Sequence, residues 1–581
     1  MAEKDDQTLP PGADDVLDTL PRDASPPAGE LKATQKTTET KHTDRVGVHR
    51  PNTCDPPTGD VTPGPNTGPK SEDVTLTLHE ACRQVVKVKV ETILFTNHDV
   101  VNENDEHGET ALHIAAAQGD LDIVATLVSA GADLESQSGL TRTKLHQAGT
   151  GVTSFVFGPT GGAAVSEKQT PLHMATKHGH QNVAQYLIEQ GAQVNARDSQ
   201  GTAPLHLASS NNCFEIARIL LRHESVVDIR NNNGETPLHA AAEHGHTDMV
   251  KLLLDHGAEK DCSARDGATP LFRAAQNGHT AIVKLLLQHG ANTEIPWREN
   301  SLSRTPLFAA SASGHTDIVR HLLDHGAEIN FTREDGVTPL HIAAQNGHTE
   351  IVRLLLEYGA EKDLMTSGET ALYIAALNGH TDIVRLLLEY GAEKDLPMKT
   401  GATPLYIAAQ QGHTEIVRLL LEYGAEKDLP MKTGATPLYI AAQQGHTEIV
   451  RLLLEYGAEK DLPMKTGATP LFIAAQKGHT EIVRLLLEYG AKKDLPIKTG
   501  ETPLYIAALK GHTEIVCLLL KGGAEKDLMT SGETALYIAA LNGHTDIVKL
   551  FIEYGAEKDL PTEEGVTPLF IAAHRDRPPS S

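Results

Sequence analysis

Cysteine, positive charge and long apolar runs are all scarce in this sequence of 581 residues. The five cysteines lie far apart and never form a Cys-x-x-Cys pair. This pattern excludes a disulfide framework and a thiolate zinc site, and it is typical of a protein in a reducing compartment. We therefore expect the chain in the cytoplasm, with the nucleus as an alternative location.

The shortage of apolar runs and of basic residues also narrows the range of partners. No stretch reaches the 18 apolar residues that read as a membrane-spanning helix, and the first residues lack the apolar core of a secretion signal. Lys and Arg number 51 against 77 Asp and Glu, a formal net charge of −26. Phosphate-binding surfaces need clustered cations, and no basic stretch stands out. We therefore expect neither nucleic acid nor membrane as a partner, and we interpret the acidity as a source of solubility.

Catalytic motifs are missing as well. The sequence has no Gly-x-Ser-x-Gly turn, no phosphate-loop lysine and no dinucleotide-binding glycine pattern. Two His-x-His pairs, His178/His180 and His244/His246, lack the accompanying carboxylate or thiolate ligands of a zinc site. We predict that the chain is not an enzyme, has no catalytic residues, and binds no metal or cofactor.

What the sequence does contain is an internal repeat. From residue 75 a threonine recurs, most often every 33 residues, and residues 398–430 and 431–463 are identical. Such a period indicates a solenoid, in which each unit packs only on its neighbours. The repeating position is occupied by Thr77, Thr110, Thr143, Thr170, Ala203, Thr236, Thr269, Thr305, Thr338, Thr370, Thr403, Thr436, Thr469, Thr502, Thr534 and Thr567.

One unit shows how each repeat is expected to fold. Thr403 and Pro404 are suited to begin a helix, and Gly412 is suited to end it. Thr414 is expected to cap a second helix, which carries an apolar stripe on one face and an ion-pair row on the other. Stacking the units buries the stripe, because each helix pair alone is too short to be stable. The stripe consists of Ile416, Val417, Leu419 and Leu420, and the ion-pair row of Glu415, Arg418 and Glu422.

These motifs resemble the ankyrin-repeat family. The resemblance rests on Thr236-Pro-Leu-His239-Ala-Ala-Ala, on Thr338-Pro-Leu-His341-Ile-Ala-Ala, on Gly-His-Thr in ten units, and on the Leu-Leu-Leu-x-x-Gly-Ala that follows. It covers residues 75 to 574. It implies an all-α fold, an ankyrin-repeat solenoid of stacked helix pairs with projecting hairpins, and binding of partner proteins on a concave face formed by hairpin tips and first helices.

The repeat pattern divides the chain into five parts. Residues 1–73, rich in proline and threonine, are expected to be a disordered tail. Residues 74–134 hold the N-terminal units, of which the first is degenerate. Residues 135–168 are a broken repeat or an insertion, with a glycine-rich stretch that disfavours helix. The main array follows at 169–574, and 575–581 form a short tail.

Two departures from the family pattern leave alternatives open. Trp297 lies in a hairpin lengthened by three residues, either as an exposed interface anchor or folded onto the adjacent hairpin. An aromatic residue replaces the family's histidine in the later units, with Met398, Met431, Met464 or Ile497 in the turn. These side chains either form a partner-facing strip or stack on one another within the array. The aromatic residues are Tyr373, Tyr406, Tyr439, Phe472, Tyr505, Tyr537 and Phe570.

The resemblance predicts a monomeric scaffold or adaptor that binds other proteins. We expect specific binding in units 169–362, because their surface positions differ from one unit to the next, whereas units 398–495 barely differ. A mechanical or spacer element, or a regulatory fragment of a larger enzyme-containing protein, are the alternatives. The candidate partner-binding residues are Gln276, Asn277, Trp297, Gln345, Asn346, Gln410 and Gln411.

Overall fold

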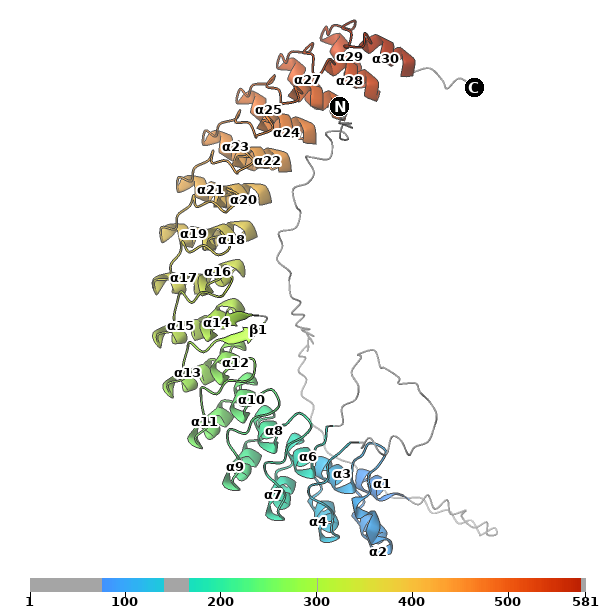
Figure 1. Ribbon diagram of the computed structural model, residues 1–581, viewed down its shortest axis with the longest axis vertical. Coiled ribbons are helices and arrows are strands. Elements are labelled where there is room, and N and C mark those ends of the chain that lie inside the picture. The colour runs from blue at the N-terminus through green and yellow to red at the C-terminus, as the bar shows by residue number, and fades with distance from the viewer. Residues whose placement is uncertain (1–75, 140–166, 300, 576–581) are drawn as a thin grey trace, which may run out of the picture. The chain divides into compact units, whose positions relative to one another are not determined.

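The computed structural model describes residues 76–139, 167–299 and 301–575, and in these ranges it consists almost entirely of short antiparallel helix pairs (Figure 1). Each pair packs on the next. The expected tail at 1–73, the stretch 140–166 and residues 576–581 lie outside the described residues.

Within the described ranges the chain forms fourteen helix pairs and one final single helix. The first helices of the pairs are α1 (Leu78–Arg83), α3 (Ala111–Gln118), α6 (Pro171–Lys177), α8 (Pro204–Ser210), α10 (Pro237–Glu243), α12 (Pro270–Gln276), α14 (Pro306–Ser313), α16 (Pro339–Gln345), α18 (Ala371–Asn378), α20 (Pro404–Gln411), α22 (Pro437–Gln444), α24 (Pro470–Lys477), α26 (Pro503–Lys510) and α28 (Ala535–Asn542), and α30 (Pro568–Arg575) stands alone. The second helices are α2 (Lys87–Thr96), α4 (Leu121–Ser129), α7 (Gln181–Glu189), α9 (Phe214–Arg222), α11 (Thr247–Asp255), α13 (Thr280–Gln288), α15 (Thr316–Asp324), α17 (Thr349–Glu357), α19 (Thr381–Glu389), α21 (Thr414–Glu422), α23 (Thr447–Glu455), α25 (Thr480–Glu488), α27 (Thr513–Lys521) and α29 (Thr545–Glu553). The other elements are a 3-10 helix, η1 (His98–Asn102), and two strands, β1 (Trp297–Glu299) and β2 (Leu302–Arg304).

The first helix of a unit begins and ends as its residues predict. Thr403 has extended backbone geometry, and its hydroxyl accepts a hydrogen bond of 3.2 Å from the Tyr406 N–H. Pro404 is the first helical residue, where it sacrifices no hydrogen bond. Gly412 ends α20 in the left-handed conformation, with φ of 85°. The cap and stop predicted for this helix are thus confirmed.

The start predicted for the second helix is wrong in one detail. Thr414 is the first residue inside α21 rather than its cap, and His413 stands at the cap position without a side-chain cap bond. The His413 ring is directed instead toward the preceding unit, where Nε2 lies 3.2 Å from the Leu377 carbonyl oxygen. A carbonyl can only accept, so Nε2 carries the proton. Gly379 is required opposite, because an added Cβ there would lie 2.7 Å from the His413 ring.

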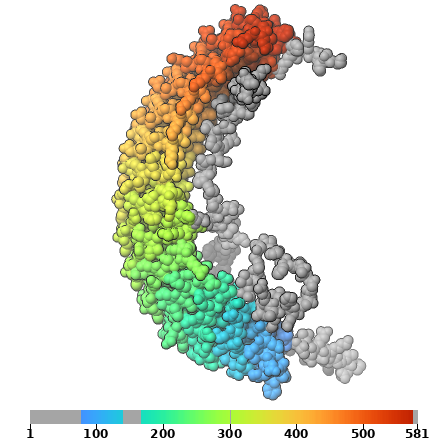
Figure 2. Space-filling model, in the orientation of Figure 1, coloured from blue at the N-terminus to red at the C-terminus, as the bar shows by residue number. Residues whose placement is uncertain are grey.

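The apolar stripe of each second helix fills one continuous core. Ile416, Val417, Leu419 and Leu420 are all buried, as are Ala408 and Ala409 of the facing first helix. Each such Leu or Ile contributes about 1.5–3 kcal/mol through its burial. The space-filling view shows neighbouring units in contact with one another (Figure 2). The ion pair expected on the exposed face is also present, with Arg418 Nε lying 3.7 Å from Glu415 Oε2.

A ladder of hydrogen bonds joins the turns that follow the second helices. Asp428 Oδ1 accepts a bond of 2.9 Å from the Glu459 N–H of the next unit. Asp395 and Asp461 make equivalent bonds at the same distance. Asn330 does so at 2.9 Å with its amide oxygen. A side-chain oxygen of either type therefore fixes one unit to the next.

The array is continuous across the stretch at 140–166. Helix α3 packs directly on α6, and α4 packs on α7. His113 Nε2 lies 2.8 Å from the Gln169 carbonyl oxygen, and His180 Nε2 lies 2.8 Å from that of Ala117. The units beginning at Thr110 and Thr170 are therefore neighbours in the stack, although 60 residues separate their threonines in the sequence.

Candidate partner-binding surface

The hairpins between units and the C-terminal ends of the first helices form what we call the hairpin surface. It includes Gln276 at the end of α12 and Asn277 after it, Gln345 at the end of α16 and Asn346 after it, and Gln410 and Gln411 in α20. All six occupy equivalent places in different units, so they follow one surface of the array rather than converging in one pocket.

Four of these six predicted residues are exposed, and two are half-buried. Gln345, Asn346 and Gln411 are exposed, as is Asn277, whereas Gln276 and Gln410 are half-buried. The two asparagines are also used within the array, because Asn277 Nδ2 donates to the Glu243 carbonyl at 3.2 Å and Asn346 Nδ2 donates to that of Ala312 at 2.9 Å. The exposed glutamines Gln345 and Gln411 are consequently the better contact residues.

Trp297 is folded onto its own array and is not a free anchor. Its ring lies 5.2 Å from that of Phe272 and packs against the buried cluster of Ala268 and Ala309. The indole N–H donates to Asp266 Oδ2 at 2.7 Å. The Arg304 guanidinium lies 5.1 Å from the ring centroid, in cation–π contact. The sequence left two interpretations of Trp297, an exposed interface anchor or a side chain folded onto the array. The structure supports the second.

Trp297 thereby holds a two-stranded hairpin in place. Strands β1 and β2 pair antiparallel, with Trp297 opposite Arg304 and Arg298 opposite Ser303. Ser303 donates to Glu334 of the next unit through both its N–H, at 2.7 Å, and its hydroxyl, at 2.6 Å. Those bonds lower the pKa of Glu334. The hairpin is fixed at its base and presents Arg298 and Glu299 as exposed side chains.

A charged network beside this hairpin was missed by the sequence reasoning. Arg273, 18% exposed, lies 3.2 Å from Asp266 Oδ2 and 3.4 Å from Glu235 Oε1. In the following unit the Arg333 guanidinium lies 5.3 Å from the Phe308 centroid and pairs with Asp335, lowering the pKa of that carboxyl. The available signal was Arg273 itself, which stands where the other units whose first helices the structure describes have an apolar residue.

The aromatic row of the later units is internal. Tyr406 is 4% exposed and Phe472 is 2% exposed, and Met398 packs against the same core. The structure therefore shows Tyr373 through Tyr537 buried within the array, which contradicts the alternative of a partner-facing strip for these residues. Phe570 is different: it is 57% exposed in α30, after which the described residues contain no further unit.

The histidine pairs do not assemble a metal site. The rings of His178 and His180 are stacked with centroids 6.2 Å apart, and His180 Nε2 is directed at a backbone carbonyl. His244 and His246 repeat this arrangement at 6.0 Å. Among the described residues, no group of three His, Cys, Asp or Glu side chains is placed to hold an ion.

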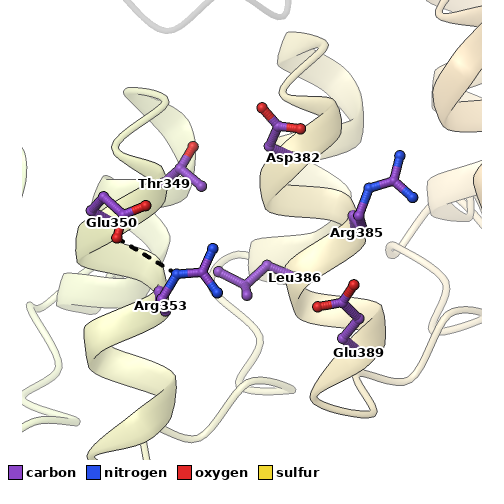
Figure 3. A pocket seen from close by; sticks show the side chains of 7 residues that line it. All are labelled: Thr349, Glu350, Arg353, Asp382, Arg385, Leu386 and Glu389. Carbon is purple, nitrogen blue, oxygen red and sulfur yellow. Dashed lines mark ion pairs between the residues drawn. The ribbon is translucent and has the colours of Figure 1, made fainter.

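A shallow groove of about 360 Å³ separates the second helices α17 and α19 on another side of the units (Figure 3). Glu350 Oε2 lies 3.6 Å from Arg353 Nε on one wall, and Asp382, Arg385 and Glu389 line the other. Both signs of charge alternate here, and the same residue types recur in the next units. The groove is therefore a charge-balanced surface between helices, without an isolated reactive group.

This architecture, in which similar helix pairs pack one on the next in a single row, defines a repeat solenoid. The sequence matches the family "Ankyrin repeats (3 copies)" in successive overlapping segments that cover 64–138 and 149–579. The chain belongs to the ankyrin-repeat family. Ankyrin repeats are generally protein–protein interaction modules. In the part of the chain that the structure describes, none of the helices has the length and apolar character needed to cross a membrane.

Individual relatives resemble only short parts of the chain. Human neurogenic locus notch homolog protein 1 is 33% identical over 119 residues, which are 19% of this chain and 5% of that protein. The transient receptor potential cation channel subfamily A member 1 homolog of Caenorhabditis elegans is 29% identical over 136 residues, 22% of this chain and 11% of that protein. The Drosophila melanogaster subfamily A member 1 channel is 27% identical over 141 residues, 21% and 12% of the two chains. The chain thus spans a small fraction of these relatives.

Proposed function

We propose that the chain is a non-enzymatic, monomeric scaffold or adaptor of the cytoplasm, with the nucleus as an alternative, and that its specific protein partner binds the hairpin surface of units 169–362. The observation that carries this proposal is the variation of exposed residues along those units. The corresponding places near the ends of successive first helices, all at least partly exposed, are occupied by Lys177, Ser210, Glu243, Gln276, Ala312 and Gln345. Such differences give a partner a different affinity for each position along the array, and specificity is a difference in affinity between alternative positions.

The β1–β2 hairpin adds a projecting feature to the same surface. Trp297 and Ser303 fix the base of the hairpin that carries Arg298 and Glu299. The hairpin backbone therefore loses little conformational entropy on binding, which favours affinity. A standard interface needs about 800 Å² per partner, an area that several adjacent units supply. The near-identical units at 398–495 offer a partner several equivalent binding positions. They would lengthen the solenoid or add avidity.

The test begins with a partner identified by affinity purification of the intact chain and mass spectrometry. A variant lacking 398–463 then removes two whole units and joins Pro397 to Met464, which recreates the local sequence at Pro430 and Met431. Affinity should barely change. A second variant, Q276A with R298A and E299A, changes the hairpin surface without touching Trp297. Affinity should fall by about tenfold or more if these residues together contribute over about 1.4 kcal/mol.

The two variants control for each other. Loss of binding in the folded deletion variant, with full binding in the triple substitution, would place the partner on the later units and reverse the assignment. Retention of binding by both would indicate a different surface. Failure of a proximity-labelling survey to find any partner would favour a spacer role.

A further inference from the structure

Four lysines occupy equivalent positions at the tips of four consecutive hairpins, and we call them the lysine ridge: Lys399, Lys432, Lys465 and Lys498. All four are exposed. The hairpins that carry them are joined by backbone bonds, since the N–H of Lys432 donates to the Thr400 carbonyl at 2.9 Å. The N–H groups of the next two lysines make the same bond to Thr433 and Thr466. The ridge is therefore one regular edge with one ammonium group per unit.

The positive charge of this edge has little local compensation. From Leu396 to Thr414 the sequence contains no Asp or Glu, and the same is true of 429–447 and 462–480. The carboxylates of each unit lie elsewhere. Glu415 pairs with Arg418 on a second helix, and Asp428 accepts a backbone hydrogen bond in the turn that follows this helix. A chain of net charge −26 thus carries a row of cations along one edge.

Acidic residues mark both ends of the ridge. Glu369 precedes the helix of the unit before Lys399, and Glu501 follows Lys498. In the three units between, the corresponding position is alanine: Ala402, Ala435 and Ala468. The uncompensated stretch is therefore limited to the span from the first lysine to the last.

The groups beside each lysine suit a polypeptide better than a nucleic acid. Pro397 and Thr400 are exposed on either side of Lys399, and the half-buried Met398 lies between them. These side chains offer apolar contacts and one hydroxyl per unit. A DNA duplex carries one charge about every 1.7 Å along its axis, a density that a single cation per unit does not match.

We propose that the lysine ridge binds an extended acidic segment of another protein in which carboxylates recur at every third residue. Neighbouring helices pack about 8–10 Å apart, and we take the same repeat distance for the lysines, because one stands on each successive hairpin. A polyproline II segment has three residues per turn and rises about 3.1 Å per residue, so every third side chain recurs after about 9.3 Å on one face. Each carboxylate then meets one ammonium group. This surface is distinct from that of units 169–362.

The interaction is weak at each unit and depends on the number of matched units. An exposed ion pair gains little alone and is screened by salt. Four pairs on one rigid edge act together, because the first contact raises the effective concentration for the rest. Binding should consequently weaken steeply as salt is added and as lysines are removed.

The experiment uses the full chain and a fluorescent peptide of five Glu-Pro-Pro triplets, with a second peptide of the same composition whose glutamates are grouped at one end. Fluorescence anisotropy at low salt should show the periodic peptide binding about tenfold or more tightly, as expected of several matched pairs. The variant K399Q, K432Q, K465Q and K498Q should lose this binding. The matched control R385Q, R418Q, R451Q and R484Q removes the same charge from second helices and should retain it.

Three results would overturn the proposal. Equal binding of the two peptides would show that only total charge matters. Equal loss in the lysine and arginine variants would show that the ridge has no special role. Tighter binding of a single-stranded oligonucleotide with the same number of charges would identify a polyphosphate surface instead. Replacement of the four lysines by arginine keeps the charge and should preserve binding. This variant tests the proposal even if the glutamine variant is unstable.

Discussion

Replacing His341 by tyrosine removes a buried titratable group from α16 and substitutes the residue that later units use at the same position. In the wild-type chain His341 is 1% exposed. Its Nδ1 lies 3.4 Å from the Thr338 nitrogen and must accept that N–H, while Nε2 lies 3.0 Å from the Leu364 carbonyl and must donate. The ring is therefore neutral. Burial lowers the pKa of His341 to about 4.

The direction of the pH effect follows from this lowered pKa. The unfolded unit has a histidine pKa of about 6.5, so between pH 6.5 and 4 it binds a proton that the folded unit does not. Stability is complete above this window and falls as pH decreases through it. At pH 5 the loss is about 2 kcal/mol per histidine, or about 30-fold in the opening equilibrium. His239, with its pKa also lowered to about 4 by burial, should lose as much.

Hydrogen exchange measured by mass spectrometry at pH 7 and pH 5, corrected for intrinsic rates, tests this reasoning. Each unit contacts only its neighbours, so the effect should remain local. Protection of α16 should fall by about 30-fold in the wild-type chain and by much less in the H341Y variant. Helix α22, whose unit has Tyr439, is the internal control. An unchanged pH dependence of α16 in H341Y would refute the assignment of acid sensitivity to this ring.

Two further substitutions test bonds between units. In the D428A variant the Glu459 N–H loses its acceptor, which should lower the free energy of thermal or denaturant unfolding by about 1 kcal/mol. The D428N variant should be nearly neutral, because Asn330 makes the same bond naturally. Equal effects of the two substitutions would contradict the role of this side-chain oxygen in joining the units. In the W297F variant the ring still packs on Phe272 but the bond to Asp266 is lost, so the hydrogen-exchange rate at 297–304 should increase by about tenfold or more. The W297A variant should increase this rate further. An unchanged exchange rate of the hairpin in W297A would show that Trp297 does not hold it in place.

Much of the fold followed from the sequence because the units are built from local signals. Thr403, Pro404 and Gly412 each act within one turn of helix, and the spacing of Ile416 and Leu420 fixes which face is buried. The prediction for Thr414 was wrong because a competing contact with the preceding unit decides the geometry. His413 takes the cap position and bonds to the Leu377 carbonyl, 36 residues away, and short-range cap rules contain no such contact.

The surface was harder to predict, because its properties depend on which residues the stacking brings together. Whether Trp297 was free or packed depended on Phe272 and Asp266, which precede it by 25 and 31 residues. Likewise, the glycine-rich stretch after Thr143 interrupts the pattern of the sequence without separating the units on either side. His113 and His180 make their bonds across it as if those units were consecutive.

The lysine ridge shows why a linear search for basic stretches is inadequate for a repeat protein. Its members are 33 residues apart, so each stands alone among uncharged residues in the sequence, and the chain as a whole is strongly acidic. Folding places one lysine on each successive hairpin, and the period of the array then becomes the period of the charges. The charged residues that one unit exposes therefore recur in each unit of the stack, and together they determine the electrostatic potential along each edge. For this reason units that are nearly identical, and poor at distinguishing registers, are suited to bind a ligand that is itself periodic.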